Sequence, residues 1–193
     1  MHIIFYGPEG SGKGTQAKLL SQTLKIPVLT SGDLVREAAE KDNGIIGEAC
    51  RKALSEGKYV ADSEMFVLWK RRLKEGDAKT DWIMDGFPRN VEQAKFLDDK
   101  LAKYGYQVEA VMYLGISQEE SLKRLLKRAR PLHPGSFELH DSPERIKSRL
   151  KIFRENEQLV LDYYRHRGVL LEINGEQSAV DVQKEILQKI HHG

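Results

Sequence analysis

Lys13 lies in a glycine-rich run that directly follows a short apolar segment. The run reads Gly7-Pro-Glu-Gly-Ser-Gly-Lys-Gly-Thr15, and residues 2–6 before it have the composition of a buried strand. Glycine backbones can approach an anion closely, so that their N–H groups point at its oxygens. The spacing Gly-x-x-x-x-Gly-Lys is typical of a phosphate-binding loop, or P-loop. The pattern predicts a polyphosphate site, and a strand-to-helix turn without a ligand is the weaker alternative.

The helix expected after this loop, over residues 15–25, would add its positive N-terminal end to the same site. Lys13 is predicted to reach the outer phosphates as a mobile charge. Thr15 is predicted to supply the hydroxyl near Mg²⁺, because Gly14 occupies the position where the general pattern has Ser or Thr. The loop therefore has the residue types needed to bind the magnesium complex of a nucleoside triphosphate.

A second anion site is indicated by two arginines outside the loop. Arg89 follows Asp85, which ends a predicted strand over residues 82–85, and Arg36 lies in a helical stretch after Thr30. A strand-end carboxylate beside a P-loop can hold Mg²⁺ through water. Guanidinium groups suit the geometry of a phosphate. These residues suggest that the acceptor of a phosphoryl group is a second phosphorylated molecule rather than water.

Basic side chains are concentrated between residues 123 and 154. Lysines on such a segment usually form a solvated helix face, but Arg124, Arg128 and Arg149 are expected to contact anions or bases. The basic residues are Lys123, Arg124, Lys127, Arg128, Arg130, Arg145, Lys147, Arg149, Lys151 and Arg154. The formal net charge of the whole chain is only +2, so a nucleic-acid binder is not expected.

The 193 residues are enough for one well-cored domain. The apolar runs are strand-length, which excludes a membrane span of about 20 residues. The N-terminus has no basic stretch followed by a hydrophobic segment and a cleavage site, so secretion is not expected. The single cysteine, Cys50, excludes an intramolecular disulfide and a four-cysteine zinc site. A cytoplasmic protein is therefore the expectation.

Five short apolar runs alternate with helical stretches. They cover residues 2–6, 27–30, 82–85, 109–114 and 169–174. This alternation predicts an α/β fold with a five-stranded parallel sheet and helices on both faces. Two stretches interrupt the pattern, a helical insertion over residues 31–60 and a proline-containing loop over residues 129–141. Ligands of such sheets bind beyond the C-terminal strand ends, so both stretches are expected to lie over the P-loop.

The motifs in this order resemble the adenylate kinases, within the nucleoside monophosphate kinase family. They are Gly7-Pro-Glu-Gly-Ser-Gly-Lys-Gly-Thr-Gln16, Thr30-Ser-Gly-Asp-Leu-Val-Arg36, Asp85-Gly-Phe-Pro-Arg89 with Gln93, Arg124-Leu-Leu-Lys-Arg128 and Ile173-Asn-Gly175. The resemblance implies the P-loop NTPase fold in a single domain over residues 1–193. The core would comprise residues 1–30, 61–128 and 142–193, with a monophosphate-binding insertion over residues 31–60 and a short lid over residues 129–141.

The resemblance also implies a role for each matching residue. MgATP would be bound by Gly10, Ser11, Gly12, Lys13, Gly14, Thr15, Arg124 and Arg128, with Arg124 stacked on the adenine. AMP would be bound by Ser31, Arg36, Val60, Gly86, Arg89, Gln93 and Arg149. Catalysis would rest on Lys13, Arg89, Arg128 and Arg149, and Mg²⁺ on Asp85 through water and on Thr15. The implied reaction is the transfer of the γ-phosphoryl group of MgATP to AMP, giving two ADP.

Two departures from the family pattern carry consequences. Glu9 stands where the family usually has proline, and it is expected to turn outward because a carboxylate near phosphates lowers their affinity. Glu138 and His140 stand in the lid where the family commonly has an arginine and the first of two aspartates, the second being Asp141. We hypothesise that Arg130, at the other end of the lid, substitutes for the absent arginine.

The choice of base and two alternative functions follow from single residues. Ser31 and Gln93 favour AMP, whereas Asn90 is more typical of UMP/CMP kinases. A UMP/CMP kinase is therefore one alternative, and a nucleotide-binding regulatory protein with weakened transfer, suggested by Glu9 and Glu138, is another. His133 and His140 flank the lid, but no zinc is expected without nearby cysteines. The expected partners are ATP and a nucleoside monophosphate, with no nucleic acid and no membrane, and the chain is expected to be a monomer.

Overall fold

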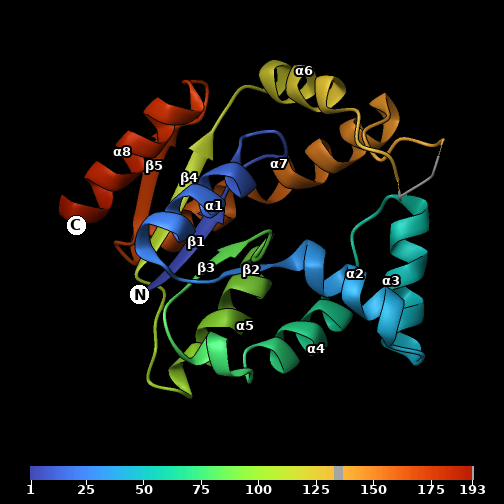
Figure 1. The fold of residues 1–193 in the computed structure, drawn as a ribbon, viewed down its shortest axis with the longest axis horizontal. Coiled ribbons are helices and arrows are strands. Elements are labelled where there is room, and N and C mark those ends of the chain that lie inside the picture. Colours follow the sequence, from blue (N-terminus) through green and yellow to red (C-terminus); the bar gives the residue numbers. More distant parts are fainter. Residues whose placement is uncertain (133–136, 193) are drawn as a thin grey trace.

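Five parallel strands form one sheet in the order β2-β3-β1-β4-β5 (Figure 1). The computed structural model describes residues 1–132 and 137–192. The strands are β1 (His2–Tyr6), β2 (Val28–Thr30), β3 (Trp82–Asp85), β4 (Ala110–Gly115) and β5 (Leu170–Asn174). All four pairs of neighbouring strands are parallel. The predicted fold class and the five predicted strands are confirmed.

Helices cover both faces of the sheet (Figure 1). They are α1 (Lys13–Leu24), α2 (Ser31–Lys41), α3 (Ile45–Glu56), α4 (Asp62–Arg72), α5 (Val91–Ala102), α6 (Gln118–Arg128), α7 (Pro143–His166) and α8 (Ala179–His192), with a 3₁₀ turn at Gly76–Lys79. The residues predicted as a helical insertion thus form α2 and α3. In the described part of the chain no helix combines the length and apolarity needed to traverse a bilayer.

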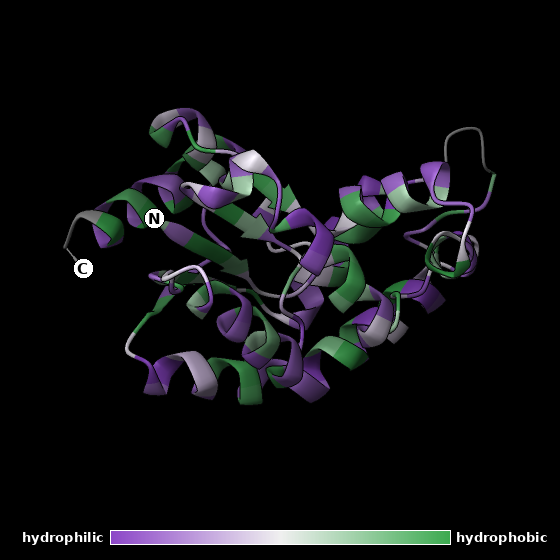
Figure 2. Cartoon of the chain, turned by 90° about the horizontal axis from the view of Figure 1, so that it is seen from below, coloured by the Kyte–Doolittle hydropathy of each residue, from purple (hydrophilic) through white to green (hydrophobic). Residues whose placement is uncertain are grey.

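The central strand β1 is buried along its whole length and supplies side chains to two separate cores. Ile3 and Phe5 pack with α1 and α8 on one face of the sheet, through residues such as Leu20 and Ile186. Ile4 and Tyr6 point to the opposite face, where they join side chains of α4, α5 and α7. This alternation follows from the two-residue repeat of a strand. The hydrophobic strands enclosed between helices of mixed hydropathy are visible in Figure 2.

Polar residues at the starts of four helices fix where those helices begin. Thr30 and Asn90 accept hydrogen bonds from backbone N–H groups in the first turns of α2 and α5. Ser117 and Ser142 do the same for α6 and α7, and Pro143 opens α7. Such caps satisfy N–H groups that have no partner within the helix. Strand β2 ends just before Ser31, and β3 ends just before Gly86. The segments that begin at these two residues therefore leave the sheet at the same edge.

Gly47 allows α2 and α3 to approach closely, which gives a prediction about stability. A Cβ atom at Gly47 would lie 1.7 Å from the backbone oxygen of Asp42, whereas one at Gly76 would have no atom within 4 Å. Gly47→Ala should therefore destabilise the protein by about 3 kcal/mol, and Gly76→Ala by much less. Thermal unfolding monitored by circular dichroism measures both. Equal melting temperatures for the two variants would contradict the tight contact.

Candidate active site

The P-loop joins β1 to α1 and leaves the N-terminus of that helix open. Gly12 precedes the helix with φ 96°, and no side chain caps the first turn. The free N–H groups there can bind an anion. Gly7 is required for a different reason, since a Cβ atom at this position would lie 2.5 Å from the backbone oxygen of Leu114 on β4. The sheet thus holds the loop in a conformation that presents its amides.

Lys13 folds back over the loop. Its Nζ donates hydrogen bonds to the carbonyl oxygens of Gly7 at 2.7 Å and Pro8 at 2.8 Å. Burial lowers the pKa of Lys13, and the neighbouring carboxylates of Asp85 and Glu9 oppose this shift. Because both acceptors are main-chain oxygens of the loop itself, the ammonium group lies directly against the loop backbone. A phosphate oxygen at the loop would compete with these carbonyls for Lys13.

Asp85 ends β3 next to the first turn of α1. Its Oδ2 would lie 3.4 Å from a Cβ atom at Gly14, so the carboxylate is within van der Waals reach of that turn. Burial raises the pKa of Asp85, and Lys13 and Arg89 oppose the shift. Within the described residues the carboxylate makes no hydrogen bond or ion pair. Carboxylate and hydroxyl oxygens are the ligands that Mg²⁺ prefers. Asp85 and the exposed Thr15 therefore fit the ion.

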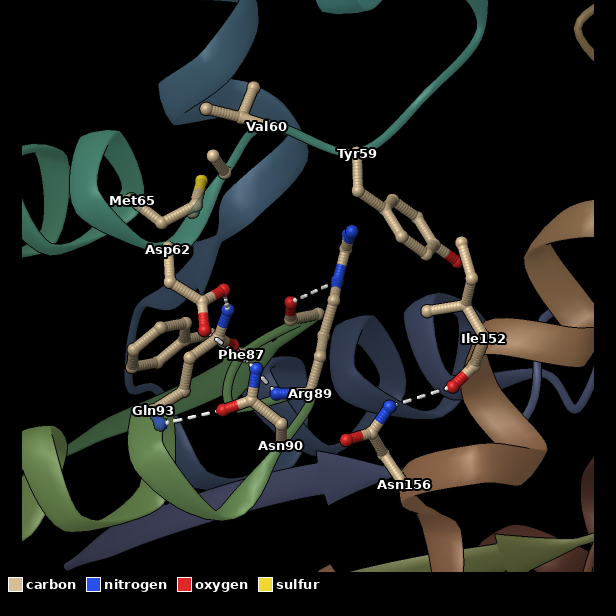
Figure 3. Close-up of a pocket in the computed structure, with 12 residues that line it drawn as sticks. Tyr59, Val60, Asp62, Met65, Phe87, Arg89, Asn90, Gln93, Ile152 and Asn156 are labelled. Carbon is tan, nitrogen blue, oxygen red and sulfur yellow. Dashed lines mark hydrogen bonds between the residues drawn. The ribbon is translucent and has the colours of Figure 1, made fainter.

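A cavity of about 250 Å³ lies between the end of β3 and the segment that follows α3 (Figure 3). It is lined by Tyr59, Val60, Ala61, Asp62, Met65, Gly86, Phe87, Arg89, Asn90, Gln93, Ile152 and Asn156. A smaller cavity of about 70 Å³ shares Tyr59, Gly86, Arg89 and Ile152 with it and extends to Glu9 and Lys13. The two cavities therefore connect the region of Arg89 to the P-loop. Four of the predicted AMP-binding residues, Val60, Gly86, Arg89 and Gln93, line the larger cavity.

Arg89 is held in an extended position toward the P-loop side of this space. Its Nε donates to the Gly86 carbonyl at 3.0 Å, and its guanidinium carbon lies 3.8 Å from the centre of the Tyr59 ring. Figure 3 shows the side chain reaching toward that ring. Stacking on an aromatic face leaves guanidinium N–H groups available for an anion. Tyr59 was not predicted from the sequence, because nothing in its local pattern indicates this contact.

Gln93 is buried in a polar network rather than free to turn. Its Nε2 donates to Asp62 Oδ1 at 2.6 Å, and its Oε1 accepts from the Arg89 backbone N–H at 2.7 Å. Asn90 donates to the other oxygen of Asp62 at 2.7 Å. An amide group has two donor protons and two acceptor lone pairs, so one of each remains for a ligand. The carboxylate of Asp62, which orients both amides, was also missed by sequence reasoning.

Ser31 and Arg36 occupy different surroundings. Ser31 is buried at the start of α2 and donates to the Gly86 carbonyl at 2.9 Å. Arg36 is exposed and donates to Asp33 Oδ1 at 2.7 Å on its own helix, and it lines neither cavity. The structure thus brings Ser31 to the site and leaves Arg36 outside it. A monophosphate contact of Arg36 would require the side chain to leave Asp33.

Arg124 lies on α6 beside the P-loop. It donates to Glu120 Oε1 at 2.7 Å and to the Gly175 carbonyl at 2.9 Å. The latter bond joins α6 to the loop after β5, which contains the predicted Ile173-Asn-Gly175 motif. The P-loop itself is attached to the same helix by a hydrogen bond from Ser121 Oγ to the Glu9 carbonyl. These contacts place the flat guanidinium group at the edge of the loop where a purine could stack.

Asp141 joins the two arginines predicted to stabilise the transferring group. Arg128 donates to both carboxylate oxygens, at 2.7 and 2.9 Å. Arg149 donates to Oδ1 at 3.1 Å and to the His140 carbonyl at 2.9 Å. Asp141 and Arg149 are both almost completely buried. The ends of α6 and α7 are therefore connected by charge-assisted hydrogen bonds, which are stronger than neutral ones.

Two residues that depart from the family pattern, Glu138 and His140, also pair with arginines. Arg130 Nη2 lies 2.9 Å from His140 Nδ1, and Arg149 Nη1 lies 2.6 Å from the same nitrogen. Burial and the charges of Arg149 and Arg130 lower the pKa of His140, and its hydrogen bond with Asp141 opposes this shift. Glu138 accepts from Arg145 at 2.8 Å. His133 lies outside the described residues, and within them no cluster of three metal-ligating side chains occurs.

The expectation that Glu9 turns outward is wrong. Its Oε2 lies 2.7 Å from Arg149 Nη1, and its side chain is 24% exposed. The physical reason is that the carboxylate gains more from the buried guanidinium group than from water. Glu9 and Lys13 line the smaller cavity together.

Comparison with known proteins identifies the family. A family model described as adenylate kinase matches residues 5–169. The chain belongs to the adenylate kinase family. It is 40% identical over 184 residues to adenylate kinase 1 of a Nostoc species, covering 95% of both chains. It is 37% identical over 188 residues to the adenylate kinase of Leptospira biflexa, covering 97% of this chain and 98% of the relative.

A third relative matches this chain over a similar extent. The adenylate kinase of Archaeoglobus fulgidus is 32% identical over 216 residues, covering 98% of this chain and 99% of the relative. The aligned region therefore spans the P-loop, Arg89 and helices α6 and α7. The P-loop NTPase α/β fold is thereby confirmed.

Asp141 gives a prediction about acid stability. Burial favours its neutral acid, but hydrogen bonds from His140, Arg128 and Arg149 outweigh burial and hold the pKa of Asp141 well below its usual range. A depressed pKa contributes stability that is fully present above about pH 4 and is lost as the pH falls further. Asp141→Asn should destabilise the protein by about 3 kcal/mol at pH 7 and flatten the loss of stability below pH 4. Urea unfolding between pH 2 and pH 7 measures both effects.

The exposed Asp99 on α5 supplies a matched control. Asp99→Asn removes the same charge but leaves the hydrogen bonds of Asp141 with Arg128 and Arg149 intact. It should leave the pH dependence of unfolding unchanged. If Asp141→Asn and Asp99→Asn had the same pH profile, the buried pairs would not stabilise the fold.

Proposed function

We propose that this protein transfers the γ-phosphoryl group of MgATP to AMP and forms two ADP. The observation that carries the proposal is that Lys13 of the P-loop and Arg89 of the second anion site line the same small cavity, which shares Arg89 with the larger one. A triphosphate at the loop and a monophosphate at Arg89 would therefore meet end to end. Family membership across the whole chain supports the same reaction, and it does not favour the alternative of a UMP/CMP kinase or a regulatory protein.

Positioning supplies much of the catalysis in this proposal. The loop amides and Lys13 would bind the ATP phosphates, and Arg89 would hold the AMP phosphate near the group to be transferred. Phosphoryl transfer requires little covalent chemistry from the protein, because alignment and charge stabilisation lower the barrier. When bound, Mg²⁺ neutralises charge that develops between the phosphates. Asp85, through water, and Thr15 are the residues that would hold it.

Arg128 and Arg149 would stabilise the transferring group, and both are held in position by Asp141. The Asp141 carboxylate accepts hydrogen bonds from both guanidinium groups. Preorganised charges need not reorient during the reaction, so they stabilise the transition state more effectively than mobile charges. Residues 31–60 and 129–141 are proposed to act as the monophosphate-binding insertion and the lid, which would exclude water from the phosphates.

The proposed base preference rests on Gln93 and Ser31. Gln93 keeps one donor proton and one acceptor lone pair at the wall of the cavity, which suits the edge of an adenine. Asn90, which suggested a pyrimidine acceptor, is engaged by Asp62 and caps α5. Its presence thus has a structural explanation that does not involve the base.

Product formation with three acceptors tests this function directly. Purified protein with ATP and Mg²⁺ should form ADP with AMP at a much higher kcat/KM than with CMP or UMP. Arg89→Ala should lower kcat/KM for AMP about 100-fold or more, because it removes a phosphate-binding charge. Arg165→Ala, on the exposed end of α7, should leave it unchanged. Equal rates with AMP and a pyrimidine nucleotide would refute the preference.

A separate variant tests whether Arg130 replaces the absent lid arginine. Arg130 lies beside His140 and within the group of arginines that includes Arg149. If it stabilises the transferring group, Arg130→Ala should lower kcat about tenfold or more with little change in the KM for AMP. The neighbouring exposed Lys127 provides the control, and Lys127→Ala should keep the full kcat. Full turnover in Arg130→Ala would leave the residue without a catalytic role.

A further inference from the structure

Glu9 connects three segments of the chain that surround the phosphate region. Its backbone carbonyl accepts a hydrogen bond from Ser121 on α6, which fixes the loop below the side chain. Its Oε1 accepts from the Tyr59 hydroxyl at 2.8 Å, and its Oε2 lies 2.7 Å from Arg149 Nη1 on α7. The side chain therefore crosses the space between the P-loop and α7 instead of leaving the site.

The carboxylate faces the cations that the proposed function assigns to substrate phosphates. Arg149 contacts it directly, and the charges of Arg89 and Lys13 also act on it. Glu9, Lys13 and Arg89 line the same small cavity. A carboxylate with a hydroxyl donor at one oxygen and a guanidinium group at the other, in a cavity that an ammonium group also lines, has surroundings like those of a bound phosphate. Glu9 thus occupies the kind of position that a substrate oxygen would take.

The same surroundings keep the carboxylate charged. Burial by itself would raise the pKa of Glu9, but Arg149, the Tyr59 hydrogen bond and the charges of Arg89 and Lys13 hold its pKa below the usual value. A charged carboxylate and a substrate phosphate at one guanidinium group would repel each other strongly at short distance. Binding of the phosphate therefore requires the Glu9 side chain to move away from Arg149.

We propose that Glu9 is a built-in anion that pairs with Arg149 and that a substrate phosphate displaces from it. The inference rests on the proposed function for the identity of the substrate, and it names a residue that sets the affinity for the phosphate. While no nucleotide is bound, Glu9 balances the charge of Arg149 and attaches the P-loop to α7 and to Tyr59. On binding, the phosphate replaces the carboxylate at Arg149.

Glu9→Gln tests the displacement, because it keeps the shape of the side chain and removes its charge. Calorimetry should show that this variant binds AMP about tenfold more tightly than the unaltered protein. Binding of adenosine, which has no phosphate, should be the same for both. Steady-state kinetics should show a lower KM for AMP with a smaller change in kcat. A purely structural role of Glu9 would alter adenosine and AMP binding alike.

Two further variants make the test decisive. Glu119→Gln removes an equal charge from the exposed start of α6 and should leave AMP binding unchanged. Tyr59→Phe keeps the ring under Arg89 but removes the hydroxyl that donates to Glu9, so it should tighten AMP binding about threefold. If Glu9→Gln does not fold, as judged by thermal unfolding, the result with Tyr59→Phe decides the question.

The outcomes separate this inference from the proposed function. Tighter AMP binding with unchanged adenosine binding supports displacement, even if no ADP forms and the proposed function fails. Unchanged or weaker AMP binding in Glu9→Gln overturns the inference, even if ADP forms normally in the unaltered protein. Tighter binding of both AMP and adenosine also overturns it, because the effect would then not act on the phosphate.

Discussion

Positive charge gathered among buried side chains is the constraint on which the arrangement of this site depends. A site that binds polyphosphates needs several cations close together, and these cations repel one another where they are shielded from water. Two carboxylates offset the repulsion, since Asp141 accepts from Arg128 and Arg149 while Glu9 lies against Arg149 from the P-loop. These two carboxylates therefore fix the positions of the Arg128 and Arg149 guanidinium groups.

The two carboxylates differ in how firmly they are attached. Asp141 directly precedes the cap of α7 and is fully buried, so its position follows from the start of that helix. Glu9 belongs to a loop that lines the smaller cavity and pairs with Arg149 on α7, where we propose that it competes with a phosphate for the same charge. Asp141 is therefore suited to hold Arg128 and Arg149 throughout the reaction. Glu9 is suited to hold Arg149 only until a phosphate replaces it. Loop residues positioned by a rigid scaffold commonly serve such roles.

Patterns within single segments predicted the scaffold well, and contacts between segments were harder to foresee. The apolar runs gave the five strands because strands buried on both faces are continuously hydrophobic, and Ser142 before Pro143 indicated the start of α7. Glu9 was expected to face water because a carboxylate near phosphates lowers their affinity. Its partner Arg149 lies 140 positions later in the chain, and no local pattern indicates that pairing. Asp62, which orients Gln93, gave no signal for the same reason.

The sequence by itself determined the class of chemistry, because the spacing around Lys13 specifies a loop whose backbone amides converge on phosphate. It also determined the parallel sheet that aims this loop and Asp85 at one edge. Only the tertiary structure decided how the charges of the site are paired, placing Arg128 on Asp141 and Glu9 on Arg149. The physical reason is that an ion pair depends on the distance between the two charges in the folded protein and on how much hydration each loses on burial. Local sequence specifies neither the distance nor the burial.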